Sequence, residues 1–279
     1  MAKNVWTPAE RVFRGWMLIS AGMYALGAAG FLLIGAHIPG VINAISRYTL
    51  PLPLYPVPAD APEGAFWRIL SVSMMAMITW IGVQAYRNPR RHGNMVPVLL
   101  LSKACSTACY TVFFIMHGHL AYMVGFLTDG PIFLITTILW YAAAGGERNL
   151  TRGEERILVA LGEALVPRGG RFNLGFSDVR DASLDGTVRM LSVMDVPTLL
   201  AIRLSLHFLN CTPLPVFGRR LTSLSEDRRA EWLMRIETRR GVTLRTCVII
   251  AKVLVLVPFF EQPEAAESVG YDRTARVRP

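Results

Sequence analysis

The chain has 279 residues, of which 52% are apolar, and a mean hydropathy of +0.38, which is more apolar than an ordinary soluble protein. A formal net charge of +9 would suggest nucleic-acid binding in a soluble chain, but here the arginines lie at the ends of apolar segments or among acidic residues. The composition therefore favours a membrane protein whose cations face anionic lipid headgroups.

Four apolar segments in the first half reach the length of roughly 20 residues that a helix needs to cross a bilayer. These segments cover residues 13–36, 66–86, 95–116 and 120–143. Lysines and arginines precede the first segment, separate the second from the third and follow the fourth, whereas the other two loops carry few of them. The positive-inside rule then predicts a multi-pass protein of the cell inner membrane with both termini in the cytoplasm.

The two loops on the opposite side differ in length. Residues 38–65 contain the stretch PLPLYPVPADAP, whose prolines exclude a continuous helix, so we expect an extended cap over the external mouth of the bundle. Only residues 117–119 separate the third and fourth segments. Such a short connection predicts that these two spans form an antiparallel hairpin.

After residue 146 the composition shifts to charged and apolar residues that alternate at helical spacing. The pattern predicts helices over residues 151–165, 196–208, 226–239 and 242–257, and none of it has the period-2 alternation of strands. We therefore predict an all-α fold, in which a four-helix transmembrane bundle (residues 1–146) is followed by a cytoplasmic helical accessory domain (residues 147–279).

Residues 242–260 are almost long enough to be a fifth span. Arg245 and Lys252 interrupt this segment, and a charge at the centre of a span costs about 2.5 to 3.5 kcal/mol on insertion scales. Two alternatives stay open: a helix that is buried in the second domain or lies on the bilayer surface, and a helix that crosses the membrane.

Lys103 and Asp129 are charged residues deep within the third and fourth segments. Because the two spans form a hairpin, both side chains are expected near mid-depth, where an unpaired charge is costly, so we expect them to pair. One interpretation is a site for a proton or a polar substrate, aided by a helix break at Gly130-Pro131. The other is a structural ion pair that fixes how the hairpin packs.

His37, His117 and His119 lie near the external ends of the first and third spans and are weak candidates for a metal or haem site. Histidines at an interface are usually solvated, and no Cys-His spacing motif is present, so we predict no bound metal. The second domain contains no GxGxxG, GxxxxGK[ST], GxSxG or HExxH pattern. We therefore predict no catalytic residues and no cofactor bound directly by this chain.

The second domain carries a series of residues that is more specific than any single motif. Phe217 is followed by LTSLSEDRRAEWLMRIE (221–237), Leu244-Arg245, Lys252, Phe259-Phe260 and SVGYD (268–272). This order resembles the helical segment that precedes the flavin domain in long-chain fatty alcohol oxidases, which belong to the glucose-methanol-choline oxidoreductase family. Residues 164–167, Ala-Leu-Val-Pro, add a looser similarity to the small subunit of gluconate 2-dehydrogenase complexes. The resemblance covers residues 154–272 and leaves out the four spans.

The resemblance implies an accessory role. In those oxidases a flavin domain follows the helical segment, whereas here only seven residues follow Asp272. We therefore expect FAD on a separate partner of the same family. The predicted function is a membrane-anchoring accessory subunit for an FAD-dependent alcohol or sterol oxidoreductase, not catalytic alone.

Partner docking is expected at one arginine-rich helix and at the end of the resembling segment. Trp and Arg often dominate interface energies, although Trp232 could instead be a core residue. The predicted docking residues are Arg228, Arg229, Trp232, Arg235, Gly270 and Tyr271. The main alternative function is a small transporter or lipid-handling protein with a polar site at Lys103 and Asp129. A third is a membrane enzyme that uses the three histidines.

Overall fold

The computed structural model describes residues 6–50, 52–56, 62–169, 174–238 and 241–270, and every regular element in these ranges is a helix. The all-α class is therefore confirmed. The chain divides into two compact units, one formed by Ala9–Ala143 and the other by Ala144–Pro279 together with Met1–Pro8.

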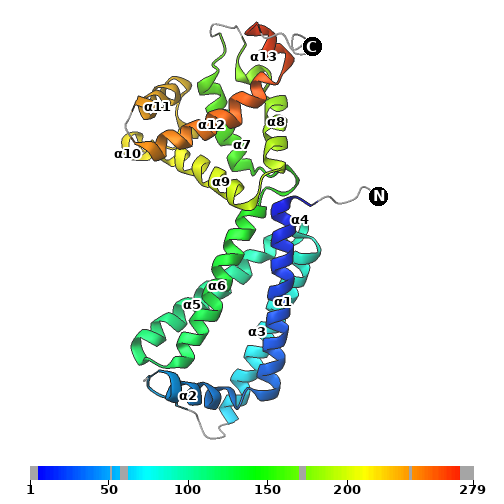
Figure 1. Cartoon of the computed structure of the whole chain (residues 1–279), viewed down its shortest axis with the longest axis vertical. Helices are drawn as coiled ribbons and strands as arrows, with labels where there is room; N and C mark the ends of the chain where they lie inside the picture. The colour runs from blue at the N-terminus through cyan, green and yellow to red at the C-terminus, as the bar shows by residue number, and fades with distance from the viewer. Residues whose placement is uncertain (1–5, 51, 57–61, 170–173, 239–240, 271–279) are drawn as a thin grey trace. The chain divides into compact units, whose positions relative to one another are not determined.

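The unit Ala9–Ala143 is built from long helices. They are α1 (Pro8–Ile34), α2 (Ile38–Thr49), α3 (Pro62–Arg87), the short α4 (Pro89–His92), the 3₁₀ turn η1 (Gly93–Met95), α5 (Val96–His117) and α6 (Leu120–Ala143). Gly118 ends α5 in the left-handed conformation (φ 68°), and its N–H donates to the carbonyl of Phe114. Glycine adopts this conformation without strain, so α6 turns back beside α5 as the hairpin of Figure 1.

The expectation of an extended loop over residues 38–65 is wrong for its first part, because α2 occupies Ile38–Thr49. Pro39 stands in the first turn of α2, where its missing N–H would have had no partner in the helix. The helix ends at Thr49, and Pro53 lies beyond its end. The Asn43 side chain then bonds both backbone groups of Tyr55, at 2.8 Å each, so the chain from 52 to 56 folds back along α2.

Apolar side chains lie both inside and outside this unit. Phe13 and Met17 of α1, Ile78 of α3, Leu99 of α5 and Ile132 of α6 pack in one buried cluster. On the outside, Leu33, Leu101 and Ile115 are 79%, 66% and 77% exposed. Helices that are apolar on every side are typical of a bundle surrounded by lipid.

The second unit has a central helix. Its elements are η2 (Gly146–Arg148), α7 (Arg152–Leu165), η3 (Phe176–Asp178), α8 (Arg180–Ser192), α9 (Val196–Cys211), α10 (Leu214–Phe217), η4 (Leu221–Ser223), α11 (Glu226–Thr238), α12 (Val242–Phe260) and α13 (Pro263–Ser268). Helix α12, orange in Figure 1, packs against α7, α8, α9 and α11. Its buried face includes Val248, Ala251 and Leu254. The sequence did not predict α8, which has few apolar residues and packs closely because Gly186 meets Pro258.

Six helical segments of the described residues are long and apolar enough to cross a membrane. Four of them coincide with the predicted spans and lie on α1, α3, α4–α5 and α6. The other two are Val196–Phe217 and Val242–Phe260. The first of these exceeds the predicted helix 196–208, because α9 continues to Cys211 and α10 follows it directly.

The contact between α5 and α6 can be tested at Gly125. A Cβ atom at this position would lie 2.8 Å from the Tyr110 ring, so Gly125→Ala should force the ring to shift and destabilise the protein by about 1 to 3 kcal/mol. Thermal unfolding in detergent measures the effect. Gly22→Ala is the control, since nothing lies within 4 Å of a Cβ there. Equal midpoints for the two variants would contradict a close contact at Gly125.

Candidate functional site

The charged residues in the centre of the bundle form one polar cluster. Lys103 Nζ lies 2.9 Å from Asp129 Oδ1, and the two side chains are only 9% and 14% exposed. Ser106 Oγ donates to Asp129 Oδ2 at 2.5 Å. The ammonium group also lies 4.5 Å from the centre of the Tyr24 ring on α1. Both charges are therefore held by partners inside the protein, as a low-dielectric environment requires.

Helical spacing explains why these groups meet. Lys103 and Ser106 are three residues apart and share one face of α5, which lies against the antiparallel α6 that carries Asp129. The expected break at Gly130-Pro131 is wrong, because α6 is continuous through Pro131. The proline still has no N–H to donate to the carbonyl of Leu127 one turn earlier, so this carbonyl lacks its usual helical hydrogen bond.

Two buried hydroxyl groups near the ion pair form no hydrogen bond within the protein. Tyr24 OH and Thr107 Oγ1 are buried and have no hydrogen-bond partner. A buried hydroxyl without a partner costs free energy, so such groups often indicate a bound water or a polar ligand. Together with the ion pair, they make this cluster the strongest candidate for binding a proton or a small polar molecule within the bundle.

A second ion pair in this unit was missed. Glu10 is 1% exposed and accepts two hydrogen bonds from Arg90, at 2.6 Å from Nε and 2.8 Å from Nη2. In the sequence, Arg90 indicates only the topology of the spans. An acidic residue at the start of a span, opposite a loop rich in arginine, was the signal that could have revealed this bidentate pair.

The structure brings two of the three candidate histidines together. The rings of His117 and His119 stack with centroids 5.9 Å apart, and His119 Nδ1 lies 3.1 Å from the carbonyl oxygen of Pro53. Tyr55 and Tyr122 complete this aromatic cluster. Among the described residues, no three His, Cys, Asp or Glu side chains form a group that could hold a metal ion. The arrangement of His117 and His119 is that of packed aromatic rings.

The structure corrects the role expected of Trp232 in partner docking. Its side chain belongs to the core of the second unit, because the residue is only 4% exposed and Nε1 donates to Thr212 Oγ1 at 3.0 Å. Phe217 packs against the indole edge-to-face, with ring centroids 5.6 Å apart. An indole held in this way has no surface to offer a partner.

The other predicted docking residues divide into two groups. Arg229 is held within the unit by Glu163 at 2.8 Å and by the carbonyl of Leu224 at 2.9 Å. Arg228 and Arg235 are exposed on α11. Gly270 is exposed after the end of α13, and its φ of 74° favours a residue without a side chain. Tyr271 lies outside the described residues.

Arg229 also lines a basic hollow that the sequence did not predict. This hollow of about 530 Å³ lies between α7, α8 and α11. Its charged lining consists of Arg152, Arg156, Arg180, Arg229, Glu155 and Glu163. The arginines outnumber the acids, so the hollow attracts anionic groups.

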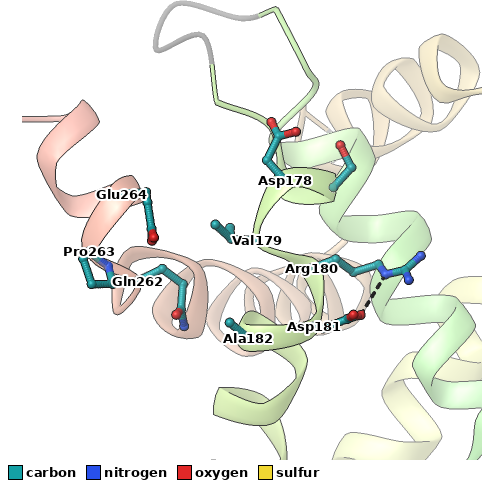
Figure 2. Close-up of a pocket in the computed structure, with 9 residues that line it drawn as sticks. Asp178, Val179, Arg180, Asp181, Ala182, Gln262, Pro263 and Glu264 are labelled. Carbon is teal, nitrogen blue, oxygen red and sulfur yellow. Dashed lines mark hydrogen bonds and ion pairs between the residues drawn. The ribbon is translucent and has the colours of Figure 1, made fainter.

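A second hollow, of about 510 Å³, is acidic (Figure 2). Asp178 and Asp181 line it from η3 and α8, and Glu264 lines it from α13. Hydrogen bonds from the Arg168 guanidinium and from the Gly175 N–H lower the pKa of Asp178 below its ordinary value. Asp181 is paired with Arg180 at 3.1 Å, the dashed contact of Figure 2. Both aspartates are thus tied to neighbours in the same unit.

A buried charge network holds the start of the second unit. Arg203 is 1% exposed; its Nη2 donates to the carbonyl of Asn149 at 3.1 Å, and its Nε lies 3.6 Å from Glu154 Oε1. Glu154 also completes a capping box with Thr151 at the start of α7. Sequence reasoning missed this network, because nothing in the apolar pattern of α9 distinguishes a buried arginine from a surface one.

Comparison with protein-family models, with curated proteins and with solved structures finds no match to this chain. The likeness of residues 154–272 to the helical segment of alcohol oxidases therefore stays a prediction.

The energy of the intramembrane ion pair can be measured with a double-mutant cycle. Asp129→Asn or Lys103→Met alone leaves one buried charge without its counter-charge, which should cost about 3 to 5 kcal/mol of stability. The double variant removes both charges and should be destabilised less than either single variant. Thermal unfolding in detergent of all four proteins gives the coupling energy. Additive losses would show that the two side chains do not interact.

Proposed function

We propose that this protein is a membrane-anchoring accessory subunit for a separate FAD-dependent oxidoreductase of the glucose-methanol-choline family, acting on lipophilic alcohols or sterols. The resemblance that suggests this role falls on residues 154–272, which belong to one helical unit. In this proposal the partner carries the FAD. The arginine distribution along the sequence supports an inner-membrane location with the second unit in the cytoplasm.

The observation that carries the proposal is the arginine-rich surface of the second unit. Arg152 and Arg156 line the basic hollow from α7, and Arg228 and Arg235 are exposed on α11, which also borders the hollow through Arg229. Arginine is enriched at protein interfaces because its planar group binds carboxylates with two parallel hydrogen bonds. A partner with an acidic surface fits this region best.

In this proposal the apolar helices hold the partner enzyme at the membrane, where its substrates are concentrated. Long-chain alcohols and sterols partition into bilayers, so an enzyme held at the membrane surface encounters them at high local concentration. The outward apolar side chains of α1, α5 and the other long helices suit such an anchor. The accessory chain would then contribute position rather than chemistry.

Copurification tests the docking role. The protein affinity-purified from its native host in mild detergent should carry a second polypeptide with a flavin absorbance band. Because like charges repel an acidic partner, the variant Arg152→Glu/Arg156→Glu should lose most of this flavin signal. Absorbance near the flavin maximum, normalised to the accessory chain, is the readout.

A matched control separates docking from general charge effects. Arg189→Glu reverses an exposed arginine on α8 that lies outside the basic hollow, and should keep the flavin band. Recovery of intact protein without a flavoprotein, with neighbouring genes expressed, would refute the proposal. A topology reporter fused at Gly146 that is found outside the cytoplasm would also contradict the proposal, which requires the second unit to be cytoplasmic.

A second candidate function is favoured by the polar cluster at Lys103 and Asp129. The ion pair and the two unpartnered hydroxyls of Tyr24 and Thr107 could receive a proton or a small polar solute inside the bundle. On this interpretation the chain is a small transporter or lipid-handling protein, and its second unit regulates the bundle.

Measurements of proton flux distinguish a transporter from an accessory subunit. Proteoliposomes loaded with a pH-sensitive dye should show proton uptake that falls to the level of protein-free vesicles in the Lys103→Met/Asp129→Asn variant, which is expected to keep its fold. Glu231→Gln on the exposed face of α11 is the control and should leave uptake unchanged. Equal uptake with the wild-type protein and with empty vesicles would exclude proton transport through the cluster.

A further inference from the structure

The second unit exposes an apolar stripe along α9 and α10. Leu204 and Phe208 of α9 are 61% and 49% exposed, and Val216 of α10 is 50% exposed. Ala201 and Cys211 lie on the same side of α9, since positions 201, 204, 208 and 211 follow helical spacing. This stripe contains no charged residue.

Helix α12 carries a second row of exposed apolar residues, with the exposed Arg245 in its first turn. Val242, Ile249, Val253 and Val257 are between 45% and 78% exposed, and Phe260 continues the stripe at 41%. Helices α9 and α12 pack against each other. Soluble domains rarely expose so many large apolar side chains, and exposed apolar surface of this extent usually marks a site that binds protein or membrane.

The opposite sides of the two helices do not suit hydrocarbon. α9 buries Arg203 against Glu154, and α12 packs against α8 and α11. Helix α8 exposes Asp181 and α11 exposes Glu231 and Arg235. Full insertion of α9 and α12 would pull such charges into the acyl region, at several kcal/mol for each uncompensated group. The exposed apolar stripes of α9, α10 and α12 are therefore suited to lipid, whereas the charged residues of α8 and α11 are suited to water.

We propose that the exposed face of α9, α10 and α12 lies on the membrane, with its apolar side chains at the boundary between headgroups and acyl chains. The short link between this unit and the apolar helices favours lipid as the surface that it contacts. α6 ends at Ala143 and α7 begins at Arg152, so a short connection joins this unit to helices that are apolar enough to span a bilayer.

Charge supports the same occupant. Arg219 and Arg220 follow α10 and are exposed, and Arg245 is exposed in the first turn of α12. Basic residues beside an apolar face favour anionic headgroups, which is the pattern of helices that lie in the membrane interface. The proposal goes beyond partner docking and does not depend on it, because the arginines at the basic hollow lie on α7, α8 and α11.

Depth-dependent fluorescence quenching tests the proposal on the full-length protein. Leu204→Cys, Phe208→Cys, Ile249→Cys or Val253→Cys is introduced singly, after Cys105, Cys109 and Cys211 are replaced by serine and the buried Cys247 by alanine. Each protein is labelled with bimane and reconstituted into vesicles of phosphatidylcholine and phosphatidylglycerol. Spin-labelled lipids carry the quencher either near the headgroup or near the methyl end of the acyl chain.

The expected result is quenching at all four positions, strongest from the quencher near the headgroup and about twofold or more above the control. Glu231→Cys on the exposed face of α11 is that control and should resemble a label in water. Absence of quenching at the four positions would overturn the proposal, because water or another protein would then cover the face. Strongest quenching from the methyl end would also overturn it, since α9 and α12 would then cross the membrane.

Discussion

The absence of water in hydrocarbon is the constraint on which the first unit depends. In such a medium each polar group must find its partner within the protein, and the bundle meets this requirement with pairs between helices. Lys103 of α5 binds Asp129 of α6, and Arg90 binds Glu10 of α1 through two hydrogen bonds. Trp16 donates to Thr136 at 2.8 Å, which ties α1 to α6. These polar links set which helix faces meet, while the apolar cluster supplies the packing.

The second unit also pairs its buried charges, but it combines them with an apolar central helix. Its central helix α12 is as apolar as a span, yet it is surrounded on one side by helices that carry many charges. Arg203 and Glu154 are buried together beside the start of the unit, where the guanidinium also satisfies the carbonyl of Asn149. The unit can therefore present one apolar face and one charged face without leaving a buried charge isolated.

The two faces give the proposed functions separate physical bases. The arginines around the hollow of α7, α8 and α11 would attract the proposed acidic protein partner, whereas the apolar stripes of α9 and α12, with Arg245 beside the latter, suit the proposed lipid surface. A module with both surfaces can hold a soluble enzyme against a bilayer. The polar cluster within the bundle is independent of both, since its charges are compensated among α1, α5 and α6.

The sequence by itself determined the helical class, the four long apolar segments and the hairpin at residues 117–119, because hydropathy, periodicity and turn chemistry are properties of neighbouring residues. It also singled out Lys103 and Asp129, since a charge within an apolar run is visible without a structure. Only the tertiary structure decided that Trp232 is buried, that Arg229 binds Glu163 and that Arg203 lies in the interior. It also revealed α2, because the proline-rich stretch that had predicted an extended segment, residues 51–62, begins only after this helix ends at Thr49. Burial and pairing depend on which residues from distant segments come to lie opposite one another, and no local pattern contains that information.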